Sequence, residues 1–459
     1  MDSKSTVLIL ELLVWTAAAT AFLSIYMRQA AQNSGLALAY LGYLWLIHWP
    51  AALMYLLPWE GLYPIQWVES GFRQSTFAIV SFTLGYVLAG PRLQRIRVLA
   101  PNDGASQFEF RALPLWYMAI GLCCYLILDP ALRTYPTVHA IGSAGWQLVT
   151  VGVALALWRA WLARNRKTLF LSLAAAAVLP ILTAVTTGYM GHGALIFIEL
   201  LAFLCTFYRP RRVLLLIIGV SVYVGMSFYV TYMRDRETLR KDVWGGSAFS
   251  TRLERAQNTL STFELFDPRN TNHLYQVDRR LDQNFLVGAA VEYIADGSVP
   301  YAGGTTIWHA FLALIPRIVW ADKPVVAGSM RVVSTYTGIE FETGTSVGMG
   351  QVFEFYINFG TVGVILGYII FGALLHGVDF GASIRLRTGR WRSFAVWYLA
   401  GLNLLAVGGS LVDISASVVA AIVNALLVNW LLPRPEPVET LRPPTVPVFA
   451  RSSVPLSRD

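Results

Sequence analysis

The sequence predicts an all-α polytopic integral membrane protein with one large loop outside the bilayer. Hydrophobic residues make up 56% of the chain and charged residues only 14%. Apolar runs of roughly 20 residues recur along the chain, and this is the length that a helix needs to cross a bilayer. One segment differs: residues 232–350 hold 12 of the 35 Lys and Arg residues and 13 of the 27 Asp and Glu residues. We therefore expect any chemistry to be concentrated in that segment.

Hydropathy predicts about eleven spans, within a range of about ten to twelve. The predicted spans are 6–27, 35–57, 74–90, 113–130, 140–162, 168–187, 191–208, 213–231, 351–375, 393–410 and 415–432. The predicted parts are an N-terminal bundle of about eight spans (1–231), the large loop (232–350), about three C-terminal spans (351–432) and a tail (433–459). The tail holds seven of the 21 prolines, and we expect it to be disordered because it has too little apolar content to form a core.

Surplus basic residues indicate the orientation of these spans. Four short loops carry them, and all four fall on the same side of the membrane: Arg92/Arg95/Arg97/Arg111, Arg164/Arg166/Lys167, Arg209/Arg211/Arg212 and Arg385/Arg387/Arg390/Arg392. That side is the cytoplasm by the positive-inside rule. The large loop is then periplasmic or extracellular, the C-terminus is cytoplasmic and the N-terminus is outside. The net charge of +8 faces anionic lipid headgroups and does not indicate a nucleic-acid partner.

Polar groups are scarce within the spans. The cysteines Cys123, Cys124 and Cys205 all lie in predicted spans, so the large loop cannot contain a disulfide. The ionisable residues within spans are Glu11, His48, Glu199 and His376. For Glu11 and Glu199 we favour a protonated or hydrogen-bonded side chain that faces a neighbouring helix.

The large loop opens with MRDRETLRK at 233–241. Arg234 and Arg240 lie just outside the bilayer, on the side where basic residues are disfavoured. Two interpretations stay open for this cluster. Its arginines either pair locally with acids at helical spacing, or they bind a phosphate-bearing substrate, since guanidinium binds phosphate through a bidentate fork.

An amphipathic helix is expected over 274–293, lying on the membrane surface. Its apolar side holds Leu274, Val277, Leu281, Phe285 and Gly288, and its polar side holds Asp278, Arg279, Asp282 and Gln283. The polar side offers two cations, Arg279 and Arg280, and one carboxylate, Asp282.

Two further stretches complete the loop. Residues 301–324 contain an apolar run too short to span, which suggests a re-entrant or interfacial helix with Arg317 held near the bilayer. Residues 343–372 place Glu354 at the outer mouth of a span, a shielded position suited to a general base. The glycines of that span, Gly360, Gly363, Gly367 and Gly372, predict close helix packing.

These stretches carry a resemblance to a known family. LIPRIVWADKP (314–324), the preceding Pro300, Tyr301, Gly303 and Gly304, and the following TSVGMGQVFEFYINFGTVGVILG resemble the oligosaccharide repeat-unit polymerases, which are O-antigen-polymerase-like (Wzy-type) membrane proteins. The resemblance covers about 90 residues, 279–372. Ala321 departs from the family pattern, which usually has proline there.

The resemblance implies an all-helical, GT-C-like glycosyltransferase of the bacterial inner membrane. Such an enzyme joins oligosaccharide repeat units carried on undecaprenyl pyrophosphate at the outer face of that membrane, and it is similar to the O-antigen ligases. Chain-length regulators and export proteins are possible partners. The family's loop positions correspond to Arg279, Arg317, Lys323 and Glu354, with the pair Tyr356 and Asn358.

The chemistry of this reaction assigns roles to the residues. Cations must stabilise the pyrophosphate leaving group, and we expect these to be Arg279, Arg280, Arg317 and Lys323, assisted by Arg234 or Arg240. Glu354 is the expected base, with Asp282 second. Stacking on sugar rings is expected from Tyr301, Trp308, Trp320 and Tyr356, and His309 is a further polar contact.

No metal or cofactor is implied, because the loop has no DxD motif and His273 and His309 are not at zinc spacing. The sequence leaves alternatives open. A ligase that transfers the glycan to another acceptor needs the same groups. A flippase or transporter needs a cationic cavity within the membrane, and a receptor or scaffold needs only a binding loop.

Overall fold

The computed structural model describes residues 3–93, 95–96, 112–128, 145–208, 211–316, 319–320, 322–324, 328–342, 345 and 347–432. These residues form helices and connecting segments, without a strand, so the predicted all-α class is confirmed within them. The helices are α1 (Ser3–Arg28), α2 (Leu36–Met54), α3 (Ile65–Leu93), α4 (Leu113–Cys123), α7 (Leu148–Leu162), α8 (Arg166–Ala177), α9 (Leu179–Thr187), α10 (Met190–Cys205), α11 (Arg211–Trp244), α12 (Phe249–Ser261), α13 (Thr271–Leu281), α14 (Asn284–Ala295), α15 (Thr305–Ala313), α16 (Ser329–Thr337), α17 (Gln351–Arg387), α18 (Trp391–Leu404) and α19 (Leu411–Leu431), with short turns of helix at Ala30–Gln32 and Cys124–Leu128.

Long apolar helices make this a multi-pass membrane protein. Within the described part of the chain, seven helical segments are long and apolar enough to cross a bilayer: Thr6–Arg28, Leu36–Met54, Ile65–Leu93, Arg166–Thr187, Leu215–Trp244, Gln351–Arg387 and Leu411–Leu431. The other four predicted spans coincide with the shorter helices α4, α7, α10 and α18. Eleven crossings therefore remain a prediction.

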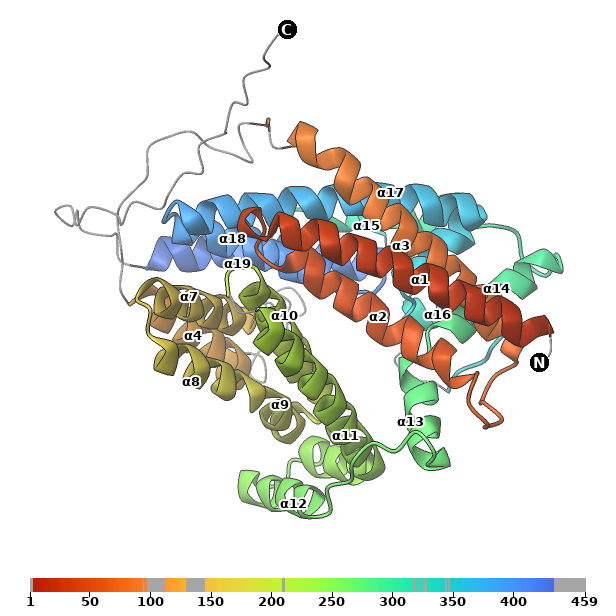
Figure 1. Cartoon of the computed structure of the whole chain (residues 1–459), viewed down its shortest axis with the longest axis horizontal. Helices are drawn as coiled ribbons and strands as arrows, with labels where there is room; N and C mark the ends of the chain where they lie inside the picture. The colour runs from red at the N-terminus through yellow and green to blue at the C-terminus, as the bar shows by residue number, and fades with distance from the viewer. Residues whose placement is uncertain are drawn as a thin grey trace, which may run out of the picture.

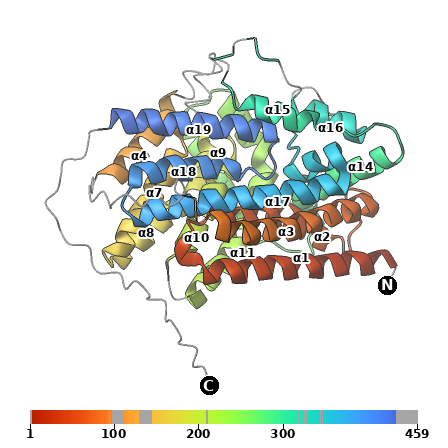
Figure 2. The ribbon, with the colours of Figure 1, turned by 90° about the horizontal axis from the view of Figure 1, so that it is seen from above.

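The helices form an elongated bundle with two distinct ends. In Figures 1 and 2, α14 and α16 lie at one end, and the α7–α8 and α17–α18 turns lie at the other. The second end carries Arg164 and Lys167 on one turn and Arg390 on the other. The first end carries helices of the predicted loop. Two of the four basic loops thus lie together, away from α14 and α16.

Helix α3 is central and packs against α1, α14 and α17. Glycines permit the two closest crossings. A Cβ atom placed on Gly288 of α14 would lie 1.8 Å from the carbonyl oxygen of Trp67 on α3, and one on Gly372 of α17 would lie 2.3 Å from that of Phe82. Backbones this close leave no room for a side chain. The prediction that Gly372 serves helix packing is thus confirmed.

Two predicted boundaries are wrong. Helix α11 continues without interruption to Trp244, well past the predicted end of its span at 231. The single helix expected over 274–293 is instead two helices, α13 and α14, separated at Asp282 and Gln283. Asp282 has an extended backbone, and its side chain accepts a hydrogen bond from the backbone N–H of Asn284, so it ends one helix and leads into the next.

Candidate functional site

Helix α17 is broken near its start, at the stretch where the sequence places its candidate base. Phe359 and Gly360 have non-helical backbone angles, and Gly360 has a φ of 62°, which glycine adopts without strain. The residues before the break pack back onto the helix after it: a Cβ on Gly363 would lie 2.4 Å from the carbonyl oxygen of Phe355. Gly363 and Gly367 therefore permit the helix before the break to pack closely on the helix after it, so the predicted helix packing is confirmed at both positions, within α17.

Asn358 connects the broken segment to residues 302–306. Its side-chain oxygen accepts a hydrogen bond from the backbone N–H of Gly304 at 2.9 Å. Its amide nitrogen donates to the Thr306 hydroxyl and to the Glu354 carbonyl oxygen, each at 2.7 Å. All of Asn358 is buried. The predicted substrate residue therefore already has protein partners for both ends of its side chain.

Glu354 lies beneath the start of α19. Its side chain is 0% exposed, and its Oε2 accepts a hydrogen bond from the backbone N–H of Leu411 at 2.6 Å. A carboxylate is favourable there because the first N–H groups of a helix lack partners and carry partial positive charge. Ser410 and Asp413 complete this cap, since the Ser410 hydroxyl lies 2.6 Å from Asp413 Oδ2.

Three connecting segments meet next to Glu354, and we call this meeting point the linker junction: 282–284, 347–351 and 405–410. The N–H groups of Gly350 and Gln351 donate to the carbonyl oxygens of Gly408 and Val407, each at 3.2 Å. The Gln283 side chain lies directly beside Gly350. The linker junction thus brings together the neighbourhoods of Asp282 and Glu354, the two predicted bases.

Asp278 and Asp282 form a buried pair, so their predicted position on a solvent-facing side of a helix is wrong. They are 0% and 2% exposed. Asp278 Oδ2 accepts hydrogen bonds from the Tyr55 hydroxyl at 3.0 Å and from the Leu62 N–H at 2.9 Å. The segment after α2 therefore covers this side of α13. Burial raises the pKa of Asp278, and burial together with the nearby Asp278 carboxylate raises the pKa of Asp282 well above its usual value.

The predicted cations differ in their surroundings. Arg279 and Arg280 are exposed at the end of α13, as predicted, with the Arg279 guanidinium 5.9 Å from the centre of the Tyr275 ring. Lys323 is half-buried and donates to the carbonyl oxygen of Ile315 at 3.0 Å. Arg317 lies outside the described residues.

Arg234 and Arg240, the first cations of the large loop, both contact protein groups. Arg234 forms ion pairs with Asp235, at 3.0 Å, and with Glu264. Arg240 donates to the carbonyl oxygen of Gly188 at 3.2 Å, and its guanidinium lies over the rings of Tyr189 and Trp244. Asp235 is adjacent to Arg234 and Glu264 lies far along the chain, so neither partner stands at the predicted helical spacing, and both interpretations of the cluster stay predictions.

The predicted aromatic residues divide into exposed and packed groups. Tyr301 is 48% exposed, and its ring lies edge-on to the buried ring of Tyr356 at 6.3 Å. Trp308 and Trp320 are exposed and His309 is half-buried. Exposed aromatic rings along and after the short helix α15 are consistent with the predicted interfacial position.

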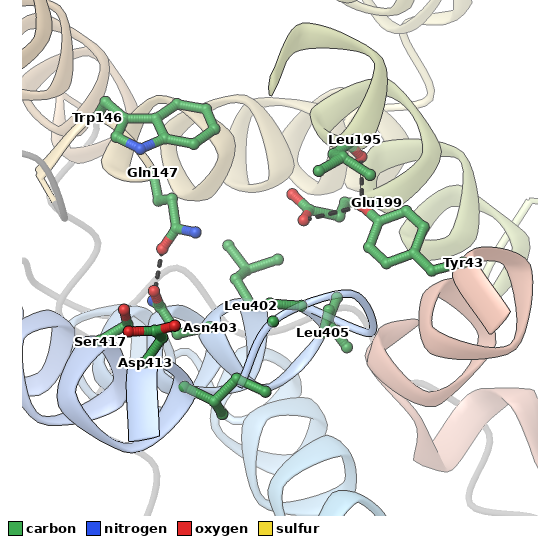
Figure 3. Close-up of a pocket in the computed structure, with 13 residues that line it drawn as sticks. Tyr43, Trp146, Gln147, Leu195, Glu199, Leu402, Asn403, Leu405, Asp413 and Ser417 are labelled. Carbon is green, nitrogen blue, oxygen red and sulfur yellow. Dashed lines mark hydrogen bonds between the residues drawn. The ribbon is translucent and has the colours of Figure 1, made fainter. Parts of the chain in front are cut away.

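A cavity of about 130 Å³ lies on the other side of the 405–410 segment. Figure 3 shows its lining, with Glu199 and Tyr43 on one side and Asp413 and Ser417 on the other. Leu405, Ala406 and Gly409 line the cavity, while the intervening Val407 and Gly408 accept the hydrogen bonds of the linker junction. One segment therefore separates Glu354 from the cavity.

The sequence did not predict this cavity. Glu199 was noticed as an ionisable residue within a span, and its hydrogen bond from the Tyr43 hydroxyl, at 3.0 Å, agrees with the favoured interpretation. Trp146, Gln147, Asn403 and Asp413 carried no signal, because they come from three separate parts of the chain and no spacing connects them. Among the described residues, no three His, Cys, Asp or Glu side chains converge as a metal site would require.

The fold and the site together define the class: an all-helical, multi-pass membrane protein with a cavity between its helices. The chain belongs to the family described as a domain of unknown function (DUF8712), whose model matches residues 102–433. No curated protein and no solved structure matches the chain.

Proposed function

We propose that the protein is a membrane glycosyltransferase that polymerises lipid-linked oligosaccharide repeat units at the outer face of the bacterial inner membrane. The observation that carries this proposal is the arrangement around residues 405–410. A buried carboxylate, Glu354, lies on one side of this segment, and a cavity whose lining includes Glu199 and Asp413 lies on the other. The resemblance of 279–372 to repeat-unit polymerases gives this arrangement its chemical interpretation.

In the proposed reaction, a sugar hydroxyl of one lipid-linked unit attacks the anomeric carbon of another. The bond between that carbon and the pyrophosphate oxygen breaks, and the new glycosidic bond forms. The hydroxyl proton passes to a carboxylate, for which Glu354 is the first candidate and Asp282 the second. The pyrophosphate leaves with its negative charge stabilised by cations, for which Arg279, Arg280 and Lys323 are candidates together with the sequence-predicted Arg317.

The side chains that line the cavity favour this function over a flippase. A flippase for a pyrophosphate-linked lipid needs cations within the membrane, whereas the described residues that line the cavity include Glu199 and Asp413 and neither Lys nor Arg. Pyrophosphate therefore fits better near the exposed Arg279 and Arg280.

The test compares glycan length in a deletion strain complemented with wild type, Glu354→Gln or Arg317→Ala. Glutamine keeps an oxygen that can accept the Leu411 hydrogen bond, so Glu354→Gln removes the base while preserving the cap. Glu340→Gln at an exposed position is the matched control. Gel ladders and mass spectrometry of lipid-linked products are read at equal membrane abundance.

We expect both variants to accumulate single repeat units without polymer, while the control makes polymer of normal length. Normal polymer in both variants would contradict the proposed residues. A full-length glycan that is not transferred to its final acceptor would identify a ligase. Absence of outward-facing repeat units would instead identify a flippase.

A further inference from the structure

We propose that the cavity between α2, α7, α10, α18 and α19 binds a single sugar ring through its hydroxyl groups. This inference rests on the proposed function, and it names the part of the substrate that this cavity holds. It concerns binding and not the transfer step. Its basis is the set of hydrogen-bonding groups that face the cavity without a protein partner, the lack of Lys and Arg among the described lining residues, and the volume of the cavity.

Glu199 is the first open group. Its side chain is 6% exposed, and its Oε1 accepts the hydrogen bond of Tyr43. Among the described residues, Oε2 of Glu199 has no hydrogen-bond partner, and Figure 3 shows the carboxylate pointing into the cavity. This oxygen is open to the cavity, so a hydroxyl group of a ligand can form a hydrogen bond with it.

Two carboxamide side chains, Gln147 and Asn403, add a hydrogen-bond donor and a hydrogen-bond acceptor. Asn403 Nδ2 donates to Gln147 Oε1 at 2.5 Å and to the carbonyl oxygen of Leu399 at 2.8 Å. Within the described part of the chain, this leaves Gln147 Nε2 without an acceptor and Asn403 Oδ1 without a donor. One free donor beside one free acceptor matches a sugar hydroxyl, which both donates and accepts.

The cavity has a mouth and a floor. Ala406 and Asp413 are exposed at the mouth, whereas Tyr43, Glu199 and Leu405 are buried at the floor. The Trp146 ring lies on the lining and offers an apolar surface for one face of a ring-shaped ligand. Acidic side chains thus lie at both depths, and neither Lys nor Arg is among the described lining residues, which favours a ligand with hydroxyl groups and disfavours phosphate.

The volume limits the ligand to one ring. A cavity of roughly 150 Å³ holds one benzene ring, so about 130 Å³ has room for one six-membered ring and not for two. The substituents of a sugar ring would reach into the mouth of the cavity. The remaining units of a glycan would extend past Ala406 and Asp413.

The experiment measures binding of methyl glycosides to the purified full chain by saturation-transfer difference NMR, in a detergent without sugar headgroups. The probes are methyl glucoside, galactoside, mannoside, rhamnoside and N-acetylglucosaminide, with inorganic pyrophosphate as the anionic probe. Ala406→Phe fills the mouth and Glu199→Gln replaces the acidic group at the floor by an amide. Their matched controls are the exposed substitutions Ala295→Phe and Glu340→Gln.

We expect at least one glycoside to bind the wild-type protein and to bind Ala406→Phe and Glu199→Gln at least tenfold more weakly, with the controls unchanged. Thermal unfolding verifies that each variant is folded. Glycoside binding that Ala406→Phe does not weaken, or no glycoside binding at all, would overturn the proposal. So would pyrophosphate binding that Ala406→Phe abolishes. Because this assay needs no glycosyl transfer, its failure is distinct from failure of the polymerase proposal.

Discussion

Asp379 of α17 holds the start of α2 in place with one carboxylate. It accepts hydrogen bonds from the Tyr26 hydroxyl at 2.9 Å, from the Ser34 hydroxyl and N–H at 2.6 and 2.7 Å, and from the Leu36 and Ala37 N–H groups at 3.3 Å each. The side chain is fully buried. A single residue from late in the chain therefore satisfies the first turn of a helix near its beginning.

We expect Asp379→Ala to reduce the free energy of unfolding by about 3–5 kcal/mol, because it leaves several buried donors without an acceptor. Thermal unfolding in detergent measures the change. Asp296→Ala, at an exposed position, is the matched control and should have little effect. Equal unfolding temperatures for the two variants would show that the Asp379 contacts contribute little.

Asp282 should make stability depend on pH. Its pKa is raised by burial and by Asp278, so the folded state keeps a proton that the unfolded chain loses above about pH 4. The free energy of unfolding should then fall as pH rises, by up to about 1.4 kcal/mol per pH unit. Tyr55 and Tyr63 also face this pair, and burial raises the pKa of Tyr63 to about 12, so Tyr63 stays neutral over this pH range.

Asp282→Asn tests this dependence, since asparagine can still accept the hydrogen bond from Asn284. We expect the unfolding temperature of the variant to exceed that of wild type by an amount that grows between pH 5 and pH 8. Asp296→Asn should keep a constant offset from wild type. Parallel curves for Asp282→Asn and wild type would contradict a shared proton at this pair.

At the scale of helices, glycine contacts fix how α14 and α17 cross α3. Gly71 of α3 faces α14, where an added Cβ would lie 1.9 Å from the carbonyl oxygen of Asn284. Gly288 makes the reciprocal approach to Trp67. Helix α14 begins at the linker junction, so the closeness of its packing against α3 also determines where Asp282 and Gln283 lie.

We expect Gly288→Ala to destabilise the protein by at least about 1–3 kcal/mol, because a methyl group there overlaps backbone that cannot move aside alone. Gly225→Ala on α11 is the matched control, since a Cβ at that position meets nothing within 4 Å. Unfolding temperatures in detergent provide the comparison. Unchanged stability for Gly288→Ala would mean that α3 and α14 separate easily.

At the scale of the whole molecule, the two ends of the bundle should face different compartments. Helix α14 lies at one end and the α7–α8 turn at the other (Figures 1 and 2). The positive-inside rule assigns the α7–α8 end to the cytoplasm. Asp296 and Ala163 are exposed positions at these ends.

Cysteine labelling tests this orientation. In a variant without Cys123, Cys124 and Cys205, we expect Asp296→Cys to react with a membrane-impermeant maleimide in intact spheroplasts. Ala163→Cys should react only after permeabilisation. The reverse pattern would invert the assigned orientation, and labelling of both in intact spheroplasts would contradict a topology with these positions on opposite sides.

The helical membrane architecture was predictable from the sequence, whereas the environment of most site residues was not. Hydropathy located every long apolar helix, because membrane insertion depends on the summed apolarity of a local segment. The charges of Asp278 and Asp282 indicated a solvent-facing side, yet both residues are buried. Asp278 is bonded to residues of the segment after α2, and helical periodicity within 274–293 does not reveal contacts with a segment so distant in sequence.

The sequence alone determined the class of protein and the segment where its polar residues concentrate, because composition and hydropathy are properties of short stretches. Only the tertiary structure decided that Glu354 caps α19, that the 282–284 turn meets 347–351, and that Glu199 and Asp413 line one cavity. These relations join residues up to about two hundred positions apart. They depend on how α3, α14, α17 and α19 pack, and packing depends on contacts between elements and not on the pattern within any one of them.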